Sequence, residues 1–329
     1  MLSSILFRSI FYVGYLLCFS IAIIKATPIN KRQSVNETKP CPFDTIIVFG
    51  DSTCDNGNTW RLSNFTYPPS DYFYKGRFSN GPTWVEYLAD FCHIKDINYA
   101  YGGATSDNQF VKATSGFHSE LIVPGIKQEV NNIYLKQITA SNNSKPNFDR
   151  ILYIVAHQGN DYLNQPSVNP RTVVGNLYEQ WEVLANFGAK HILINKFFNL
   201  KYLPRPPKNG RLKYVIKNLL SRFITRLHNA AIDFYVWLFR MKYKNVKLYI
   251  LPMDKIWEEF QEPSVKKELG ITDYENPCVV REDIGNTTTY TVCSNPGQHF
   301  YWDYIHPSTK IHRYVGYKTY QIVTAKTGN

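Results

Sequence analysis

Two short motifs supply the types of side chain that cleave acyl bonds. Ser52 follows Gly50-Asp51 at the end of an apolar run, and Asp303 stands three residues before His306 near the C-terminus. A serine hydroxyl is a poor nucleophile until a positioned base removes its proton. His306 can act as that base, and Asp303 can orient the imidazole and stabilise its cation. The two motifs therefore predict a serine hydrolase with Ser52 as its nucleophile.

Each of these side chains also has a simpler structural interpretation. Ser52 could cap the helix after the first strand, and Asp303 could cap the last helix. We interpret Cys54 as a packing residue, Asp51 as a residue that holds its loop, and His157 as a structural histidine at a strand end. No Gly-x-Ser-x-Gly sequence occurs, which argues against the nucleophile elbow of the α/β-hydrolases.

Five buried strands are expected to position the motifs. Each is a short apolar run without polar alternation, as expected for strands covered on both faces. They span 45–49, 98–101, 150–156, 190–195 and 246–251. Helical patterns separate them at 82–91, 124–139, 172–187 and 211–242, and a last helix begins at Pro307. This alternation predicts an α/β fold, a three-layer α/β/α sandwich with a five-stranded parallel sheet in flavodoxin-like order.

Polar, glycine-rich segments follow three of the strands, at the edge of the sheet where ligands bind. In chain order the sequence carries Gly50-Asp51-Ser52, Gly103, Gly159-Asn160-Asp161 and Asp303-x-x-His306. This series resembles the four blocks of the GDSL (SGNH) hydrolase family, and Gly76–Glu86 resembles a further segment of its fungal and plant members. The resemblance spans residues 45 to about 320. It implies the SGNH-hydrolase fold, in one catalytic domain that we place at 44–329.

The resemblance also implies an oxyanion hole. We expect no metal or other cofactor, since no Cys-x-x-Cys or His/Cys cluster in the sequence has zinc spacing. The resemblance assigns the oxyanion donors to the backbone N–H groups of Ser52 and Gly103 and to the side-chain amide of Asn160. Gln158 departs from the family pattern, which has glycine at this position, and Thr53 replaces a common leucine. A bulky Gln158 could tilt Asn160 away or serve as the donor itself. Alternatively, Asn160 is only a turn residue.

The N-terminal residues have the pattern of a secretory signal. Arg8 precedes an apolar run from Ile10 to Ile24, and Ala26 is a small residue at a suitable cleavage point. We expect a signal peptide at 1–26 and a pro-segment or polar tail at 27–43, with an uncleaved anchor as the alternative. Four Asn-x-Ser/Thr sequons agree with a secreted, extracellular glycoprotein: Asn36, Asn64, Asn142 and Asn286.

Cysteine usage fits an oxidising compartment. The chain has six cysteines, and Cys18 belongs to the expected signal. Cys278 and Cys293 flank a polar, turn-rich segment and are expected to form a disulfide bond. An odd number remains, so at least one thiol stays outside intramolecular pairs. The sequence leaves the pairing of three cysteines open: Cys41, Cys54 and Cys92.

Composition bears on the partners of the chain. With 44% hydrophobic and 19% charged residues, it is typical of globular proteins. The formal net charge is +11, and 13 Lys and Arg residues face one acidic residue, Asp233, between 196 and 247. That segment could contact an anionic lipid or polysaccharide surface, but we favour the simpler explanation of a solvated helix face. Nucleic acid is not expected as a partner, because no binding motif occurs. We expect a monomer.

Three hypotheses about function follow. The leading one is a secreted esterase that removes short acyl groups, chiefly acetyl, from carbohydrate. It depends on the aromatic content of 15%, on the resemblance to fungal members, and on the lack of an apolar insertion between the blocks that would serve as a lid. The second is a lipase or phospholipase of the same family. The third is a non-catalytic protein that keeps the fold and binds lipid or cell-wall polymer.

Overall fold

The structure is a computed structural model of the chain that describes residues 40–140, 146–204, 211–284 and 287–325. The expected signal peptide and the sequons at Asn36, Asn142 and Asn286 lie outside these ranges, whereas Asn64 is exposed. The expected tail was drawn as far as residue 43, but Phe43 is buried and Cys41 is disulfide-bonded to Cys92. The packed unit therefore includes residues that we assigned to the tail.

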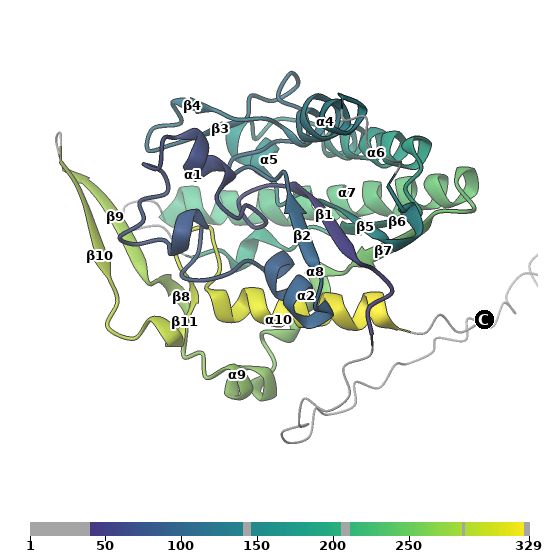
Figure 1. Cartoon of the computed structure of the whole chain (residues 1–329). Helices are drawn as coiled ribbons and strands as arrows, with labels where there is room; N and C mark the ends of the chain where they lie inside the picture. Colours follow the sequence, from purple (N-terminus) through teal and green to yellow (C-terminus); the bar gives the residue numbers. More distant parts are fainter. Residues whose placement is uncertain (1–39, 141–145, 205–210, 285–286, 326–329) are drawn as a thin grey trace, which may run out of the picture. The chain divides into compact units, whose positions relative to one another are not determined.

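A five-stranded parallel sheet forms the centre of the packed unit (Figure 1). Its strand order is β2-β1-β5-β6-β7, so the first strand of the chain lies inside the sheet and the connections reverse direction beside it. The strands are β1 (Thr45–Gly50), β2 (Lys95–Asn98), β5 (Ile151–Ala156), β6 (His191–Asn195) and β7 (Lys247–Leu251). The predicted α/β fold with a five-stranded, flavodoxin-like parallel sheet is confirmed.

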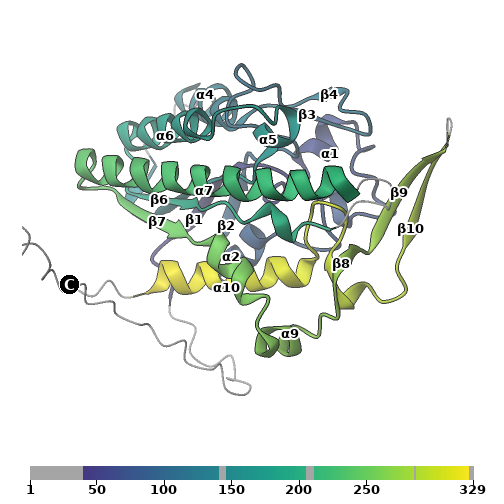
Figure 2. The same ribbon diagram turned by 180° about the vertical axis from the view of Figure 1, so that it is seen from behind.

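Helices cover both faces of the sheet because the strands bury apolar side chains on both sides. Ile46 and Val48 point into one core and Ile47 and Phe49 into the other, in the alternation of an extended chain. The first core is covered by α2 (Trp84–Cys92), α8 (Met253–Glu259) and α10 (Thr309–Thr324). The second is covered by α6 (Pro170–Phe187), α7 (Arg211–Lys242) and a run made of α3 (Ile126–Gln128), the π-helix η2 (Glu129–Tyr134) and α4 (Leu135–Ala140). Figures 1 and 2 show these two groups from opposite sides.

Local sequence sets the ends of these helices. Thr83 and Glu86 form a capping box at the start of α2, in which the Glu86 carboxylate accepts from Thr83 N–H at 2.8 Å. The side chain of Asn169 caps α6, and Pro170 occupies its first turn. Gly188 ends α6 with a φ of 128°, a conformation that side chains disfavour. None of the helices in the described ranges is long and apolar enough to cross a membrane.

Two elements differ from the sequence expectation. The second strand begins at Lys95, three residues before the expected segment, because it is an edge strand with alternating exposure and lacks an apolar run. Its expected continuation still pairs, since Tyr99 N–H donates to the carbonyl of Val48 at 2.8 Å. The cysteine-bounded segment is not a loop but an antiparallel hairpin, β9 (Val279–Ile284) and β10 (Thr287–Val292). The disulfide bond between Cys278 and Cys293 closes its base, while Cys54 is a buried free thiol.

The smaller elements connect these parts. They are α1 (Asn58–Leu62), η1 (Tyr74–Gly76), β3 (Thr114–Ser115), β4 (Leu121–Ile122), η3 (Phe148–Arg150), α5 (Asn160–Asn164), η4 (Leu200–Tyr202), α9 (Pro263–Leu269), β8 (Asp273–Pro277), η6 (Pro296–Gln298) and β11 (His299–Tyr301). Of these, α1 follows β1, α5 follows β5 and η4 follows β6. All three therefore begin near the carboxyl edge of the central sheet.

Candidate active site

Ser52, His306 and Asp303 form a hydrogen-bonded row. His306 Nε2 lies 2.7 Å from Ser52 Oγ, and His306 Nδ1 lies 2.7 Å from Asp303 Oδ2. Ser52 and His306 are each 8% exposed, so the row is largely shielded from water. If Nδ1 carries the proton that it shares with Asp303, Nε2 can accept the serine proton. The arrangement can therefore support general-base chemistry.

The loop from Trp302 to Pro307 positions the imidazole and the carboxylate. Trp302 N–H donates to the carbonyl of His306 at 2.7 Å, which closes the loop. Asp303 Oδ1 accepts from the backbone N–H groups of Ile305 and His306 at 2.8 and 2.7 Å. The carboxylate is thus held by the same short segment that carries the histidine, which explains why a spacing of three residues brings the two groups into contact.

The simpler interpretation of both motif residues as helix caps does not hold. The N-cap residue of α10 is Ser308, and the N-cap residue of α1 is Gly57. Burial on its own would raise the pKa of Asp303, but the charge and hydrogen bonds of His306 and the backbone outweigh it and hold that pKa below its ordinary value. Asp303 is therefore ionised and can stabilise a positive imidazole.

Hydrogen bonds to Asp51 connect the turn after β1 to the end of the neighbouring strand β5. Its Oδ1 accepts from the N–H and the hydroxyl of Thr53 at 3.0 and 2.9 Å, and its Oδ2 accepts from Gln158 N–H at 2.6 Å. Gly50 has to lack a side chain, because a Cβ there would lie 2.7 Å from the carbonyl oxygen of Ala156. These contacts agree with the structural part that the sequence suggested for Asp51.

A hydrogen bond joins Asn160, the first residue of α5, to the loop that carries Gly103. Asn160 Nδ2 donates to the carbonyl of Ala104 at 2.9 Å, which uses one of its two N–H groups. Gly103 has a φ of 92°, and a Cβ there would clash with the carbonyl of Thr114, so glycine is required. Gln158 lines the same pocket as Asn160, but its Oε1 is buried without a hydrogen-bond partner among the described residues.

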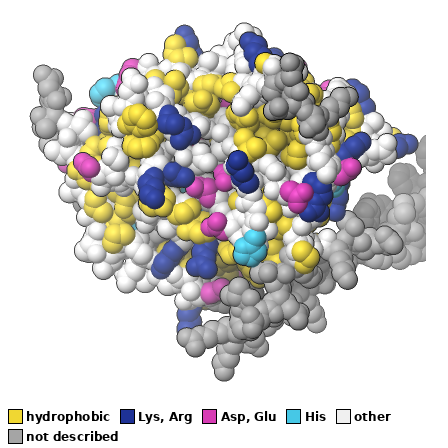
Figure 3. All heavy atoms as spheres, in the orientation of Figure 1, with side chains coloured by type: hydrophobic (Ala, Val, Ile, Leu, Met, Phe, Trp, Pro, Cys, Tyr) yellow, Lys and Arg dark blue, Asp and Glu magenta, His cyan; other side chains and the backbone are white. Residues whose placement is uncertain are grey.

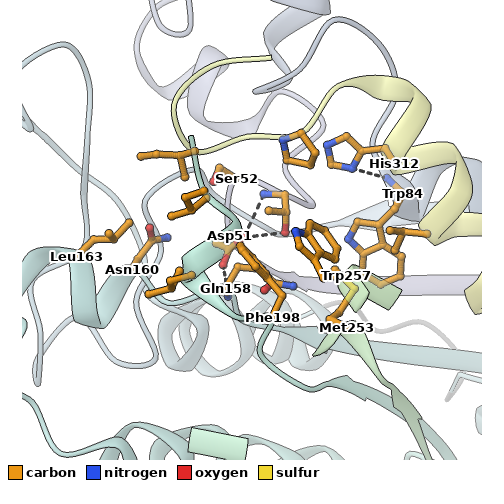
Figure 4. Close-up of a pocket in the computed structure, with 16 residues that line it drawn as sticks. Asp51, Ser52, Trp84, Gln158, Asn160, Leu163, Phe198, Met253, Trp257 and His312 are labelled. Atoms are coloured by element: carbon orange, nitrogen blue, oxygen red, sulfur yellow. Dashed lines mark hydrogen bonds between the residues drawn. The ribbon is translucent and has the colours of Figure 1, made fainter. Parts of the chain in front are cut away.

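An apolar pocket opens beside Ser52 (Figure 4). Its apolar wall consists of Trp84, Leu163, Phe198, Leu200, Leu203, Met253, Trp257, Ile305 and Val315. Trp84, Met253 and Trp257 are buried core residues and make the wall rigid, whereas Leu163 and Ile305 are 36% and 44% exposed. Pro307 and six polar residues complete the lining: Asp51, Ser52, Thr53, Gln158, Asn160 and His312. The apolar part of the lining suits an apolar chain.

The comparison with known families decides the class of the protein. The family described as GDSL-like Lipase/Acylhydrolase matches residues 46–318, which is most of the chain. The chain belongs to this family. It is thus a carboxylic ester hydrolase of the GDSL type, and the resemblance found in its sequence is confirmed.

Curated relatives match over most of this GDSL hydrolase. It is 26% identical to the thermolabile hemolysin of Vibrio parahaemolyticus, over 88% of this chain and 68% of the relative. It is 24% identical to a GDSL esterase/lipase of Arabidopsis thaliana, over 92% of this chain and 93% of the relative. It is 28% identical to the phosphatidylcholine-sterol acyltransferase of Aeromonas hydrophila, over 72% of this chain and 65% of the relative.

Three buried carboxylates join the loops of this hydrolase: Asp161 of the third block, and Asp55 and Glu129, which the sequence did not single out. Asp55 accepts from Gly102 N–H at 2.9 Å, and Asp161 accepts from the N–H and the hydroxyl of Ser106 at 2.8 and 2.7 Å. Glu129, in the π-helix η2, accepts from Gly50 N–H at 2.8 Å. Burial raises the pKa of Asp55 and of Glu129, although hydrogen bonds from backbone N–H groups oppose the shift. The signal available in the sequence was an acidic residue within an apolar or glycine-rich segment.

His157 has a structural environment, as the sequence suggested. Its Nε2 lies 2.7 Å from Asp161 Oδ2, and its ring stacks on that of His228 at a centroid distance of 5.7 Å. His228 Nδ1 in turn lies 2.6 Å from Tyr162 Oη. Burial lowers the pKa of His228 well below its ordinary value, so its ring is neutral. The cluster joins α5, which carries Asn160, to α7.

The segment 76–86 supports the histidine loop. The Phe78 ring lies 5.1 Å from that of His306, and Ser79 Oγ donates to the carbonyl of Pro307 at 2.9 Å. Asn80 Oδ1 accepts from Thr309 N–H at 2.8 Å, at the start of α10. The sequence marked this segment only through the family resemblance, and the structure supplies its physical reason. Within the described ranges, no three or more His, Cys, Asp or Glu side chains gather in a way that could hold a metal ion.

Proposed function

We propose that Ser52 is the nucleophile of this ester hydrolase, with His306 as its base and Asp303 as the group that orients His306. The observation that supports this proposal most strongly is the row of hydrogen bonds from Ser52 Oγ through His306 to Asp303, each with 2.7 Å between its two atoms. The oxyanion donors we propose are the N–H groups of Ser52 and Gly103 and the Asn160 amide, which the resemblance assigns and the loop contacts support.

The reaction then has two halves. Ser52 Oγ attacks the carbonyl carbon of the ester while its proton passes to His306 Nε2, and the oxyanion donors stabilise the tetrahedral intermediate. The intermediate collapses, the alcohol leaves with the proton from His306, and an acyl group remains on Ser52. Water then repeats the sequence, with His306 as base, and releases the carboxylic acid and the free serine.

The acyl group that we propose is a medium or long apolar chain, so the protein would act as a lipase or phospholipase. Ten of the sixteen residues that line the pocket beside Ser52 are apolar, and Trp257 and Met253 form part of its wall. Two relatives bear names that refer to lipid, an esterase/lipase and a phosphatidylcholine-sterol acyltransferase. The sequence expectation of acetyl groups on carbohydrate remains the competing prediction, based on aromatic content, the resemblance to fungal members and the lack of a lid-like insertion.

A panel of nitrophenyl esters from acetyl to palmitoyl, with acetylated sugars and phosphatidylcholine, tests the acyl preference. We expect kcat/KM to rise with chain length up to at least eight carbons. A maximum at acetyl, or a preference for acetylated sugars, would favour the carbohydrate esterase instead.

A matched pair of variants connects that preference to the pocket. Leu203→Trp should fill part of the pocket and lower kcat/KM for long esters at least tenfold while it spares acetyl esters. Ile122→Trp introduces the same side chain at a residue that is 57% exposed and outside the pocket lining, so it should change neither. Equal effects of the two variants would remove the pocket from the explanation.

We further propose that the protein is secreted, with residues 1–26 as a cleaved signal and glycans on its sequons. Two disulfide bonds and the exposed Asn64 are compatible with this route. N-terminal sequencing of the protein from culture medium, before and after glycosidase treatment, tests it. Protein that is retained in cells with Met1 intact would contradict secretion.

A further inference from the structure

Helix α7 carries an exposed apolar face in addition to the one that it buries. Ile232, Val236 and Phe239 pack into the second core and account for the amphipathic pattern of the helix. Five large apolar residues lie on its exposed side: Phe223, Leu227, Phe234, Trp237 and Met241. Their exposed fractions are 60%, 42%, 42%, 58% and 59%. We call these five residues the α7 ridge.

The α7 ridge is a continuous stripe. At 3.6 residues per turn, its five members fall within an arc of about 80° along some five turns of helix. Exposed apolar residues are common singly, but a contiguous row of aromatic and long aliphatic side chains marks a contact surface. Figure 2 shows α7 in the foreground on that side of the packed unit, with no other described element drawn in front of it.

Basic side chains flank the ridge. Arg222, Arg226 and Arg240 are exposed along one side of it, and Lys242 is exposed along the other. Asp233 is the acidic residue of α7, and Lys196 pairs with it at 2.8 Å. On the opposite side of the packed unit, basic and acidic side chains are instead interspersed with apolar ones (Figure 3). An apolar stripe with three arginines along one side and a lysine along the other resembles helices that lie in the interface of anionic membranes.

The ridge is connected to the pocket beside Ser52. Asn229 of α7 holds Phe197 through two hydrogen bonds, of 2.8 and 2.9 Å, to the backbone of that residue. The chain that follows supplies the pocket residues Phe198 and Leu200. The α7 helix therefore supports one wall of the pocket.

We propose that the α7 ridge docks this enzyme on an anionic lipid surface, with the five apolar side chains in the acyl region and the flanking basic groups among the headgroups. This proposal rests on the proposed function in one respect: the lipid surface would supply the ester that the enzyme hydrolyses. A second copy of the chain is a poorer occupant, because a symmetric contact would bring the arginine rows of both copies together.

Binding is tested with Ser52→Ala protein, so that no lipid is hydrolysed. Vesicles of phosphatidylcholine are compared with vesicles that also contain phosphatidylglycerol, by sedimentation and by Trp237 fluorescence. We expect binding to the anionic vesicles, a blue shift of the emission that Trp237→Phe removes, and weakening by salt.

Three further variants separate the contributions. The triple variant Phe223→Gln/Trp237→Gln/Met241→Gln should bind anionic vesicles at least tenfold more weakly. Arg222→Gln/Arg226→Gln/Arg240→Gln should lose the preference for anionic over neutral vesicles. Ile122→Gln/Val292→Gln is the matched control, since these residues are 57% and 46% exposed but lie away from α7, and it should bind like the parent.

Unchanged vesicle binding by the ridge variant would overturn the proposal. The proposal would also be overturned if the parent is a dimer in size-exclusion chromatography and the ridge variant alone is a monomer, because a second copy would then cover the ridge. With Ser52 restored, the ridge variant should keep its kcat/KM on a soluble ester. If the parent protein hydrolyses the soluble ester but does not bind vesicles, the docking surface alone is refuted. If it binds vesicles but hydrolyses no ester, the proposed function alone is refuted.

Discussion

His306 Nε2 lies 2.7 Å from Ser52 Oγ although 254 residues separate the two in the chain. The turn after β1 carries Ser52, and the loop before α10 carries His306. Segment 76–86 contacts that loop and its helix, through Ser79 and Asn80. The proton path of the proposed reaction therefore depends on how the first strand, α2 and the last helix pack together.

Removing any member of the row should reduce turnover much more than binding. We expect Ser52→Ala and His306→Ala to lower kcat by roughly 10⁵ or more, and Asp303→Asn by about 10⁴, with KM nearly unchanged. Steady-state kinetics on a soluble ester measures this. Circular dichroism of each variant controls for folding, and a folded Ser52→Ala protein with more than a few per cent of the parent activity would contradict the assignment.

Asn160→Ala should lower kcat by roughly 10² to 10³ with little change in KM, because the charge that it stabilises exists only in the transition state and intermediate. Gln158→Ala is the comparison, since Gln158 lines the same pocket and its Oε1 lacks a hydrogen-bond partner among the described residues. We expect Gln158→Ala to keep kcat within about threefold. The reverse result, with Asn160→Ala active and Gln158→Ala crippled, would make Gln158 the oxyanion donor.

Acid should destabilise the fold in part through His312. Burial, with a smaller contribution from the charge of His306, lowers the pKa of His312 to about 3 from 6.5. Between pH 3 and pH 6.5 the unfolded chain binds a proton at this histidine, and the folded chain does not. The free energy of unfolding therefore falls as the pH drops below 6.5. We expect this residue to contribute a loss of roughly 2 kcal/mol between pH 7 and pH 4.5.

Urea unfolding of His312→Gln at the two pH values measures that contribution. Glutamine can still accept the hydrogen bond that Trp84 N–H donates to His312 Nδ1 at 3.2 Å, so the difference between pH 7 and pH 4.5 should shrink in the variant. His118→Gln, at an exposed histidine, should leave the difference as in the parent. An identical pH dependence in all three proteins would refute the prediction.

The disulfide bond at the base of the β9–β10 hairpin should stabilise the protein measurably. Cys278 and Cys293 enclose a loop with a sequence separation of 15 residues, for which the chain-entropy model gives about 3 kcal/mol. Cys278→Ser/Cys293→Ser should lower the free energy of unfolding by that amount. Non-reducing peptide mapping of the parent is the control, and free thiols at both positions would remove the basis of the prediction.

Local patterns made the outline of the fold and the Ser52 and His306 motifs predictable. Buried strands are apolar runs, and the spacing of Asp303 and His306 is set within one short loop. The hairpin of residues 279–292 differs from the turn-rich segment that we expected, because its threonines and charged residues suit both a turn-rich segment and an exposed ribbon.

The contacts that the sequence could not predict connect distant segments. Glu129 accepts from Gly50 across 79 residues, and the bond between Cys41 and Cys92 closes 51 residues. An acidic residue or a cysteine shows that a partner is needed but not which one, since that depends on the packing of β1 against its neighbours. For the same reason the pocket, built from six separate segments, gave no signal in the sequence.

The central claim is that His306 activates Ser52 for nucleophilic attack. Treating the pure protein with a fluorophosphonate probe and measuring intact and peptide masses tests it most directly. The account predicts a single adduct on the peptide that carries Ser52, its disappearance in Ser52→Ala, and labelling that is at least a hundredfold slower in His306→Ala. A folded protein that takes up no probe, or that takes it up on another residue, would contradict the account.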